Sequence, residues 1–217
     1  MSIRISELPR EDELRFDAVI RIYQAAIEPT EQKPPQLLRR HLADPRYHFL
    51  IAETAGQLIG FSLVFIPESN DLWLVEYVAI DASLRSAGIG SRLFQASCDL
   101  ARKLAPDAAG ILEVDSPSSE SSSSIDIARR LTFYARNGCR LIEGLNYILP
   151  LSSAGQPPPM QLLLTADFRC NRLEKRVLHR WLTIIYSEVY SQPSDDRRIA
   201  IMISQLPDII SLGEIAS

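Results

Sequence analysis

Cysteine, histidine and long apolar runs are all scarce in this sequence, and each scarcity argues against a class of protein. The 217 residues include three cysteines and three histidines, with no CxxC pair and no spacing typical of a metal site. No apolar run approaches the roughly 18 residues of a membrane helix, and the first dozen residues carry charges where a secretory signal would be apolar. We therefore expect a cytoplasmic protein with reduced cysteines, no metal and no membrane partner.

A basic surface is missing as well. The formal net charge is -4, and Lys and Arg form no stripe with interleaved aromatic residues. This argues against nucleic acid as a partner. Hydrophobic residues make up 46% of the chain and charged residues 23%, which is typical of a soluble globular protein with a sizeable core. The length fits one large domain better than two.

The hydrophobic pattern predicts an α/β fold. Gly56 lies between two apolar runs and can supply the positive φ of a hairpin turn. The run Leu72–Ile80 is apolar on both faces except for one carboxylate, which indicates a central strand. The order of elements is not a repeating βαβ array, so we expect a mixed sheet of six to seven strands flanked by helices. The expected helices cover 12–28, 35–43, 91–104 and 125–137, and the expected strands cover 2–8, 47–53, 58–66, 72–80, 111–115, 139–149 and 160–167.

The tail beyond residue 168 is expected to be an extension packed on a domain that spans 1–168. Residues 170–190 are predicted to form a long amphipathic helix, whereas 196–217 is compatible with either strand or helix. A stripe this apolar must be covered, either by the chain itself or by a second copy, and the surplus apolar surface favours a homodimer. The stripe consists of Leu173, Val177, Trp181, Ile184, Ile185 and Val189.

The most informative motif follows the strand 72–80. It reads Arg85-x-x-Gly88-x-Gly90, and a helix is predicted to begin directly after it. Glycines let backbone N–H groups approach a phosphate closely, and a helix N-terminus adds unpaired donors. The motif therefore suits a pyrophosphate. A dinucleotide-binding loop would need glycine in place of Leu93, and a P-loop would need Gly-Lys-Ser/Thr, which is missing.

This motif resembles the acetyl-CoA signature of the GNAT family of acyl-CoA N-acetyltransferases. The segment Leu131–Cys139, which contains Tyr134 and Gly138, resembles the second marker of that family, and the two occur in the right order with a strand between them. The resemblance covers roughly residues 2–168. It departs from the common pattern at Cys139, which replaces a phenylalanine. It also departs at Ile127 and Arg130, which replace an Asn and an Ala, so an Asn contact to pantetheine is in doubt.

The resemblance implies that acetyl-CoA is the cosubstrate. Backbone groups of Val78 and Ile80 would pair with its pantetheine arm, because the strand 72–80 would splay from the strand 111–115. Main-chain N–H groups of the loop and of the first helical turn would hold its pyrophosphate. The residues implied in this loop are Arg85, Ser86, Ala87, Gly88, Ile89, Gly90 and Ser91.

Two glutamates are candidates for removing a proton from the acceptor. An amine attacks a thioester only as the free base, yet lysine-like amines have a pKa near 10.4 in water. Glu76 interrupts an apolar strand, where a buried carboxylate is costly unless it has a function, and it is the first candidate. The alternative is a structural role, in which Glu76 pairs with a buried Arg or with a capping water. Glu113 has a similar place in the strand 111–115 and is the second candidate, with a purely structural role as its alternative.

Tyr134 is the candidate for stabilising or protonating the leaving thiolate, and packing against Phe133 is its alternative. We therefore expect an acyltransferase that moves an acetyl or acyl group from CoA to the amine of a small molecule or peptide, by direct transfer in a ternary complex. A non-catalytic acyl-CoA-binding regulatory module is the alternative function. The resemblance places acceptor choice in the early helices and loops, at about residues 20–45, and in the later strands.

Overall fold

The computed structural model describes residues 2–84, 88–117, 124–150, 159–166, 168 and 170–215. They group into two compact units, Met1–Ala108 and Ala109–Ser217, which are described in turn. Within the described part of the chain, no helix is long and apolar enough to cross a membrane. The same residues contain no group of three or more His, Cys, Asp or Glu side chains that could hold a metal ion.

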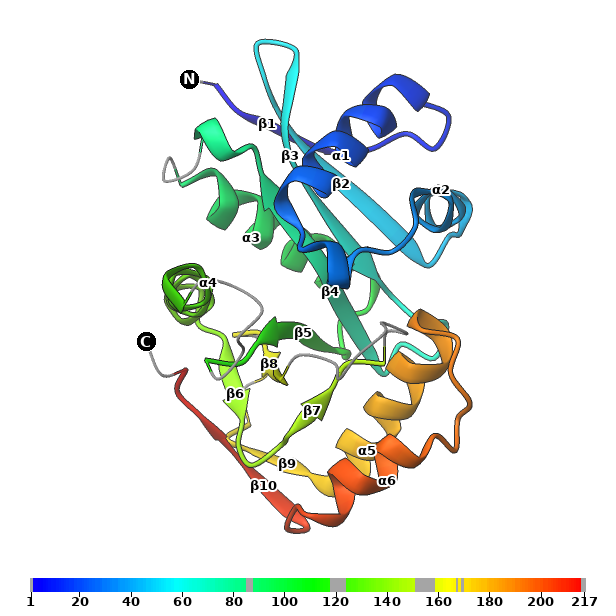
Figure 1. The fold of residues 1–217 in the computed structure, drawn as a ribbon, viewed down its shortest axis with the longest axis vertical. Helices are drawn as coiled ribbons and strands as arrows, with labels where there is room; N and C mark the ends of the chain where they lie inside the picture. The colour runs from blue at the N-terminus through cyan, green and yellow to red at the C-terminus, as the bar shows by residue number, and fades with distance from the viewer. Residues whose placement is uncertain are drawn as a thin grey trace. The chain divides into compact units, whose positions relative to one another are not determined.

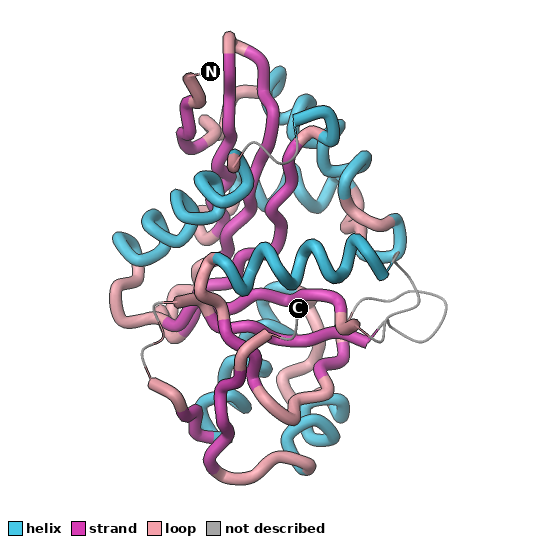
Figure 2. Tube along the Cα trace, turned by 90° about the vertical axis from the view of Figure 1, so that its left-hand side faces the viewer, coloured by secondary structure: helices cyan, strands magenta, loops and turns pink. Residues whose placement is uncertain are grey.

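The first unit is an antiparallel sheet in the order β1-β2-β3-β4 with helices on both sides (Figures 1 and 2). Side chains of a strand alternate between faces. Phe61 packs edge-on against Tyr23 of α1, with ring centroids 6.2 Å apart. The next residue, Ser62, meets Ser97 of α3 through their hydroxyls at 2.8 Å. Helices α1 and α3 therefore cover opposite faces. The elements are β1 Arg4–Glu7, α1 Glu13–Ala26, α2 Pro35–Ala43, β2 Tyr47–Thr54, β3 Gln57–Phe65, β4 Leu72–Ile80 and α3 Ile89–Leu104.

Short-range signals set several boundaries of this unit. Helix α1 begins where the Asp12 carboxylate accepts a hydrogen bond from the backbone N–H of Arg15. The turn between β2 and β3 uses Ala55 and Gly56 with φ of 48° and 77°, as a two-residue hairpin turn requires. The expected ranges 35–43 and 72–80 match α2 and β4. Glycine at position 56 was predicted for this turn, and its positive φ is confirmed.

The second unit has a sheet in the order β5-β8-β6-β10-β9, with β7 also paired to β8, and all of these pairs are antiparallel. Strands β6 and β7 lie along the same edge of β8. One strand was expected over 139–149, and the chain instead breaks it with a turn at Gly144, whose φ is 75°. The elements are β5 Ala109–Asp115, α4 Ser124–Arg136, β6 Arg140–Ile142, β7 Tyr147–Ile148 and β8 Pro159–Leu164.

The tail corrects the expectation of one helix over 170–190. Residues Arg172–Glu174 form strand β9, and only then does α5 begin, at Lys175–Ile184, followed by a π-helical turn at Ile185–Val189. Helix α6 spans Arg197–Ser204, and β10 spans Ile209–Gly213. Strand β10 pairs with both β6 and β9. The extension, expected to be helical, therefore also contributes two strands, β9 and β10. Within 1–168, the break at Gly144 adds one strand to the seven expected. The mixed α/β class is confirmed.

The apolar stripe of the tail is covered largely within its own unit. Trp181 packs edge-on against Phe168, with ring centroids 5.9 Å apart, and Ile185 and Val189 are buried. Tyr186 donates a hydrogen bond from its hydroxyl to the backbone carbonyl of Ile148 at 2.5 Å. Val177 and Ile184 of the stripe stay half-buried, so most of the apolar surface on which the homodimer was expected is covered. The homodimer remains a prediction.

Candidate active site

Strands β3 and β4 lose their register at Glu76. Leu63 pairs with Tyr77 and Val64 pairs with Val75, which leaves Glu76 without a partner residue in β3. Such a β-bulge re-aims the side chain of the extra residue and is common next to active sites. The Glu76 side chain is only 2% exposed. The carboxylate found in the sequence as an interruption of an apolar strand is therefore the bulged residue.

Lys33 is the partner of this carboxylate. Its Nζ lies 2.5 Å from Glu76 Oε2, and the Lys33 side chain is 3% exposed. The other carboxylate oxygen, Oε1, is buried and makes no hydrogen bond to the described protein atoms. The ion pair weighed as the alternative to a catalytic role is thus present, with a lysine in place of an arginine. Removing one partner of such a buried ion pair strongly destabilises the folded protein, because the other charge is left buried and unpaired.

Two tyrosines fasten the segment that carries Lys33 to β4. Tyr23 accepts a hydrogen bond from the backbone N–H of Lys33 at 2.6 Å, and its ring contacts that of Tyr77 edge-on at 5.0 Å. The hydroxyl of Tyr77 donates to the backbone carbonyl of Glu31 at 3.3 Å. Burial raises the pKa of Tyr23, so this phenol stays protonated. Sequence reasoning missed all three side chains, although Tyr23 and Lys33 fall in the region 20–45 expected to choose the acceptor.

The end of β4 leads through a short 3-10 turn, Ala82–Leu84, to helix α3. Arg85, Ser86 and Ala87 lie outside the described residues. Gly88 precedes the helix with φ of 72°, a conformation that strains any residue with a Cβ. Among the described residues, no side chain caps this helix end, and an added Cβ at Gly88 would meet none of their atoms within 4 Å. The first turn, with Ile89, Gly90 and Ser91, therefore begins at an open helix N-terminus suited to an anion.

Val78 and Ile80 extend from the bulge towards this helix. They lie opposite Ser62 and Gly60 of β3. A Cβ added at Gly60 would come within 2.4 Å of Ile80 Cδ1 and 2.9 Å of a backbone oxygen, so glycine permits the close approach of the two strands. Glu76, Val78, Ile80 and the start of α3 thus follow one another along a single stretch of the first unit.

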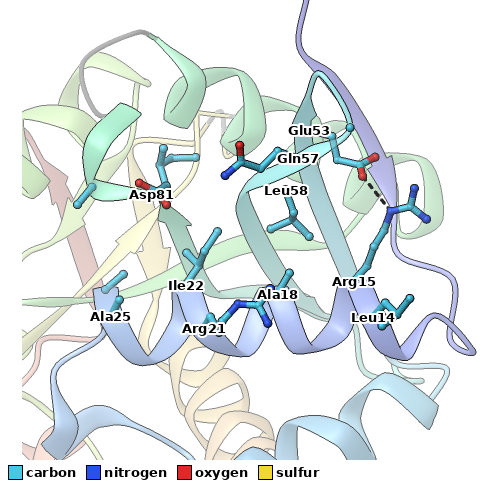
Figure 3. Close-up of a pocket in the computed structure, with 14 residues that line it drawn as sticks. Leu14, Arg15, Ala18, Arg21, Ile22, Ala25, Glu53, Gln57, Leu58 and Asp81 are labelled. Carbon is cyan, nitrogen blue, oxygen red and sulfur yellow. Dashed lines mark hydrogen bonds and ion pairs between the residues drawn. The ribbon is translucent and has the colours of Figure 1, made fainter.

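A cavity of about 570 Å³ opens on the first unit (Figure 3). Helix α1, the β2–β3 turn and the end of β4 line it. At its rim Arg15 Nε lies 2.8 Å from Glu53, and Asp81 lies where β4 ends. Ile80 of β4 is among the residues that line it, whereas Glu76 and Lys33 are not.

Glu113 lies in β5 of the second unit and is held by two phenols. Tyr190 donates to Glu113 Oε2 at 2.6 Å, and the hydroxyl of Tyr147 donates to Oε1. Burial, and then the charge of Glu113, raise the pKa of Tyr147 well above its usual value, so this phenol remains a donor. Tyr190 belongs to the extension, directly after the π-helical turn. Sequence reasoning singled out Glu113 but neither of its partners.

Tyr134 lies in α4 of the second unit and is half-buried. Its ring contacts that of Phe133 edge-on, with centroids 5.1 Å apart, which is the packing weighed as its alternative role. Its backbone carbonyl accepts a hydrogen bond from Cys139 at 3.0 Å, where Gly138 ends the helix with φ of 78°. A role of Tyr134 at the thioester remains a prediction.

Comparison with known proteins decides the family. The Acetyltransferase (GNAT) family matches residues 16–124, half of the chain. This chain belongs to the GNAT acetyltransferase family. The match includes β4, the start of α3 and Glu76, and it confirms the resemblance to this family. The second motif, at 131–139, lies beyond the matched residues. No curated protein matches the chain in sequence.

Solved GNAT structures share the fold at low identity. A GNAT-family protein from Bacteroides thetaiotaomicron is 21% identical, with a TM-score of 0.69 over 88% of this chain and 99% of that one. The ribosomal-protein-S18-alanine N-acetyltransferase of Escherichia coli is 17% identical, with a TM-score of 0.54 over 76% and 93%. A GNAT acetyltransferase from Elizabethkingia anophelis with acetyl-CoA bound is 18% identical, with a TM-score of 0.52 over 75% and 97%. These likenesses show the fold alone.

Two of the departures from the common GNAT pattern, at Ile127 and Arg130, have structural explanations. Ile127 is buried at 2% exposure and contributes to the core. Arg130 forms an ion pair with Asp115 at the end of β5, with Nη1 and Oδ2 2.6 Å apart. Both side chains are therefore used within the second unit, as packing and as the cation for a buried carboxylate.

Proposed function

We propose that this GNAT chain transfers an acetyl or acyl group from CoA to the amine of a small molecule or peptide, by direct attack in a ternary complex. The observation that carries the proposal is Glu76, a buried carboxylate at the bulge of β4. It lies on the same strand that leads to the open N-terminus of α3. One strand thus offers a proton acceptor and, at its end, a cradle for an anion.

Acetyl-CoA would lie along the end of β4. Its pyrophosphate would bind the N–H groups of residues 86–91, and its pantetheine arm would pair with Val78 and Ile80. A strand rises about 3.3 Å per residue, so Glu76 lies about 13 Å back along the strand from Ile80. An arm that runs along β4 would bring its thioester to the level of the bulge.

The acceptor would arrive as an ammonium ion and lose a proton to Glu76, directly or through water. The free amine would then attack the thioester carbonyl, and the C–S bond would break. Tyr134 would donate a proton to the leaving thiolate, and the second proton lost by the acylated nitrogen would restore the Tyr134 hydroxyl. Glu113 would be the second candidate for the base. We assign the transferase domain to 1–168, with 169–217 packed on it as an extension, and place the protein in the cytoplasm.

The ion pair favours a second candidate function. The Lys33 ammonium is already paired with the Glu76 carboxylate. In this second function the chain binds acyl-CoA as a non-catalytic regulatory module. Such a module would be stabilised by acetyl-CoA but would release no CoA thiol when amines are added. A thiol-release assay with a panel of small and peptide amines therefore separates the two functions.

Acetyl-CoA binding is tested by thermal unfolding of Gly88→Glu. Acetyl-CoA at one hundred times its Kd should stabilise the wild type by about 2.7 kcal/mol through mass action. Gly88→Glu should abolish this stabilisation, because a carboxylate would occupy the place of the pyrophosphate. Gly56→Glu is the matched control, since Gly56 also has a positive φ with no atom within 4 Å of an added Cβ. Stabilisation that survives in Gly88→Glu would overturn the cofactor assignment.

A further inference from the structure

The proposed reaction gives no role to the amine of Lys33, which lies in the first unit. In that reaction the acceptor nitrogen must come within hydrogen-bonding distance of Glu76. Lys33 Nζ is a primary amine at 2.5 Å from Glu76 Oε2, with both side chains almost completely buried. Lys33 therefore occupies the position that the proposal gives to the acceptor amine.

The backbone around Lys33 holds the amine in this position. The N–H of Lys33 donates to the Tyr23 hydroxyl at 2.6 Å, and the preceding Glu31 carbonyl accepts from Tyr77. Pro34 and Pro35 follow at once and begin α2, which restricts the segment further. A reacting group held in this way gains the large rate advantage of an intramolecular reaction.

We propose that Lys33 is a self-acetylation site, modified in cis from acetyl-CoA bound to the same chain. The inference rests on the proposed function. The nitrogen forms a bond to the acetyl carbonyl carbon while the C–S bond breaks, and the bonding electron pair leaves with the sulfur. The ammonium loses two protons, of which one goes to Glu76 and one ends on the CoA thiol. The product is a neutral amide, which removes the cation from Glu76.

Lysine is rare enough in this chain to make the modification easy to assign. The three lysines are Lys33, Lys103 and Lys175. Lys103 is exposed on α3, and Lys175 is half-buried, with its ammonium on the Leu206 carbonyl at 2.8 Å. Chemical acetylation without catalysis should follow exposure and label Lys103 before Lys33. Enzymatic transfer should reverse this order.

The test incubates the full chain with acetyl-CoA carrying a deuterated acetyl group, followed by digestion and peptide mass spectrometry. We expect one label per chain at Lys33, with a first-order rate that does not change with protein concentration. Acetyl phosphate, as the uncatalysed control, should label Lys103 and leave Lys33 unmodified. A rate that rises with protein concentration would show transfer between chains and overturn reaction in cis.

Variants identify the groups that act. Lys33→Arg keeps a cation for Glu76 and should lose the label, whereas Lys103→Arg is the matched control and should keep it. Glu76→Gln should slow labelling at least tenfold, and an unchanged rate would remove Glu76 from the step. The wild-type result stands without these variants if any of the three fails to fold.

Two outcomes separate this inference from the function on which it rests. A chain that is stabilised by acetyl-CoA and releases thiol with added amines, but carries no label at Lys33, overturns self-acetylation and leaves the proposed function intact. A chain that acetyl-CoA neither stabilises nor labels overturns both.

Discussion

Glu76 and Glu113 occupy similar positions in sequence but very different surroundings in the two units. Each is a single carboxylate in an otherwise apolar part of a strand. In the first unit Glu76 meets an ammonium, that of Lys33. In the second unit Glu113 accepts hydrogen bonds from the phenols of Tyr147 and Tyr190. The difference lies in the side chains that neighbouring segments place beside each strand: a lysine in the first unit and two tyrosines in the second.

The two kinds of partner have different electrostatic consequences. An ammonium neutralises the carboxylate that it contacts, and it carries protons that can be transferred. Phenols hydrogen-bond to a carboxylate without cancelling its charge, and burial keeps Tyr147 protonated. Glu76 therefore already lies against an amine, as a general base for amine acylation must, whereas Glu113 lies in a fixed network that joins the extension to β5. This contrast favours Glu76 over Glu113 as the proposed base.

The largest effect should come from removing the two carboxylates one at a time. Glu76→Gln should lower kcat/KM for amine acetylation by about a hundred- to ten-thousandfold, the range of general acid–base catalysis. Glu113→Gln should lower it by less than about tenfold, because its expected role is to hold the second unit together. Thiol release with the best amine of a panel measures both, and thermal melts verify folding. The opposite ranking would make Glu113 the base.

A smaller effect should follow from breaking the phenol network. Tyr190→Phe keeps the ring and removes the hydroxyl that donates to Glu113 at 2.6 Å. Hydrogen bonds to charged groups contribute about 1.5–3 kcal/mol, so the free energy of unfolding should fall by that amount. Urea unfolding of Tyr190→Phe, Glu113→Gln and the double variant gives the coupling between the two side chains. Additive losses would mean that the hydroxyl and the carboxylate act independently.

The outcome at particular residues shows what sequence could and could not predict. Local signals succeeded: the glycine at position 56 correctly predicted the hairpin turn, and the apolar run 72–80 correctly predicted β4 with its lone carboxylate. The tail failed because β9 at 172–174 pairs with β10 at 209–211, and this distant partner overrides a local helical period. Lys33 lies 43 residues from Glu76, and Tyr190 lies 77 from Glu113. No local pattern encodes these pairs, so the carboxylates were found and their partners were missed.

The smallest effect concerns His41, a second buried side chain that the charge of Lys33 influences. Burial, and then the charge of Lys33, lower the pKa of His41 from 6.5 to about 3. Below pH 6.5 the unfolded chain takes up a proton that the folded chain refuses until about pH 3, so stability falls as the pH falls through this window. His41→Phe keeps the stacking on Tyr47, whose ring centroid is 3.9 Å away, and removes the titration.

Between pH 7 and about pH 5.5 the His41→Phe variant should therefore lose about 1 kcal/mol less stability than the wild type. Urea unfolding across this range measures the difference. The exposed His179→Gln is the matched control and should follow the wild-type curve. Equal pH slopes for wild type and His41→Phe would mean that His41 takes up its proton in the folded chain as readily as in the unfolded one. The charge of Lys33 would then act on Glu76 and not on the pKa of His41.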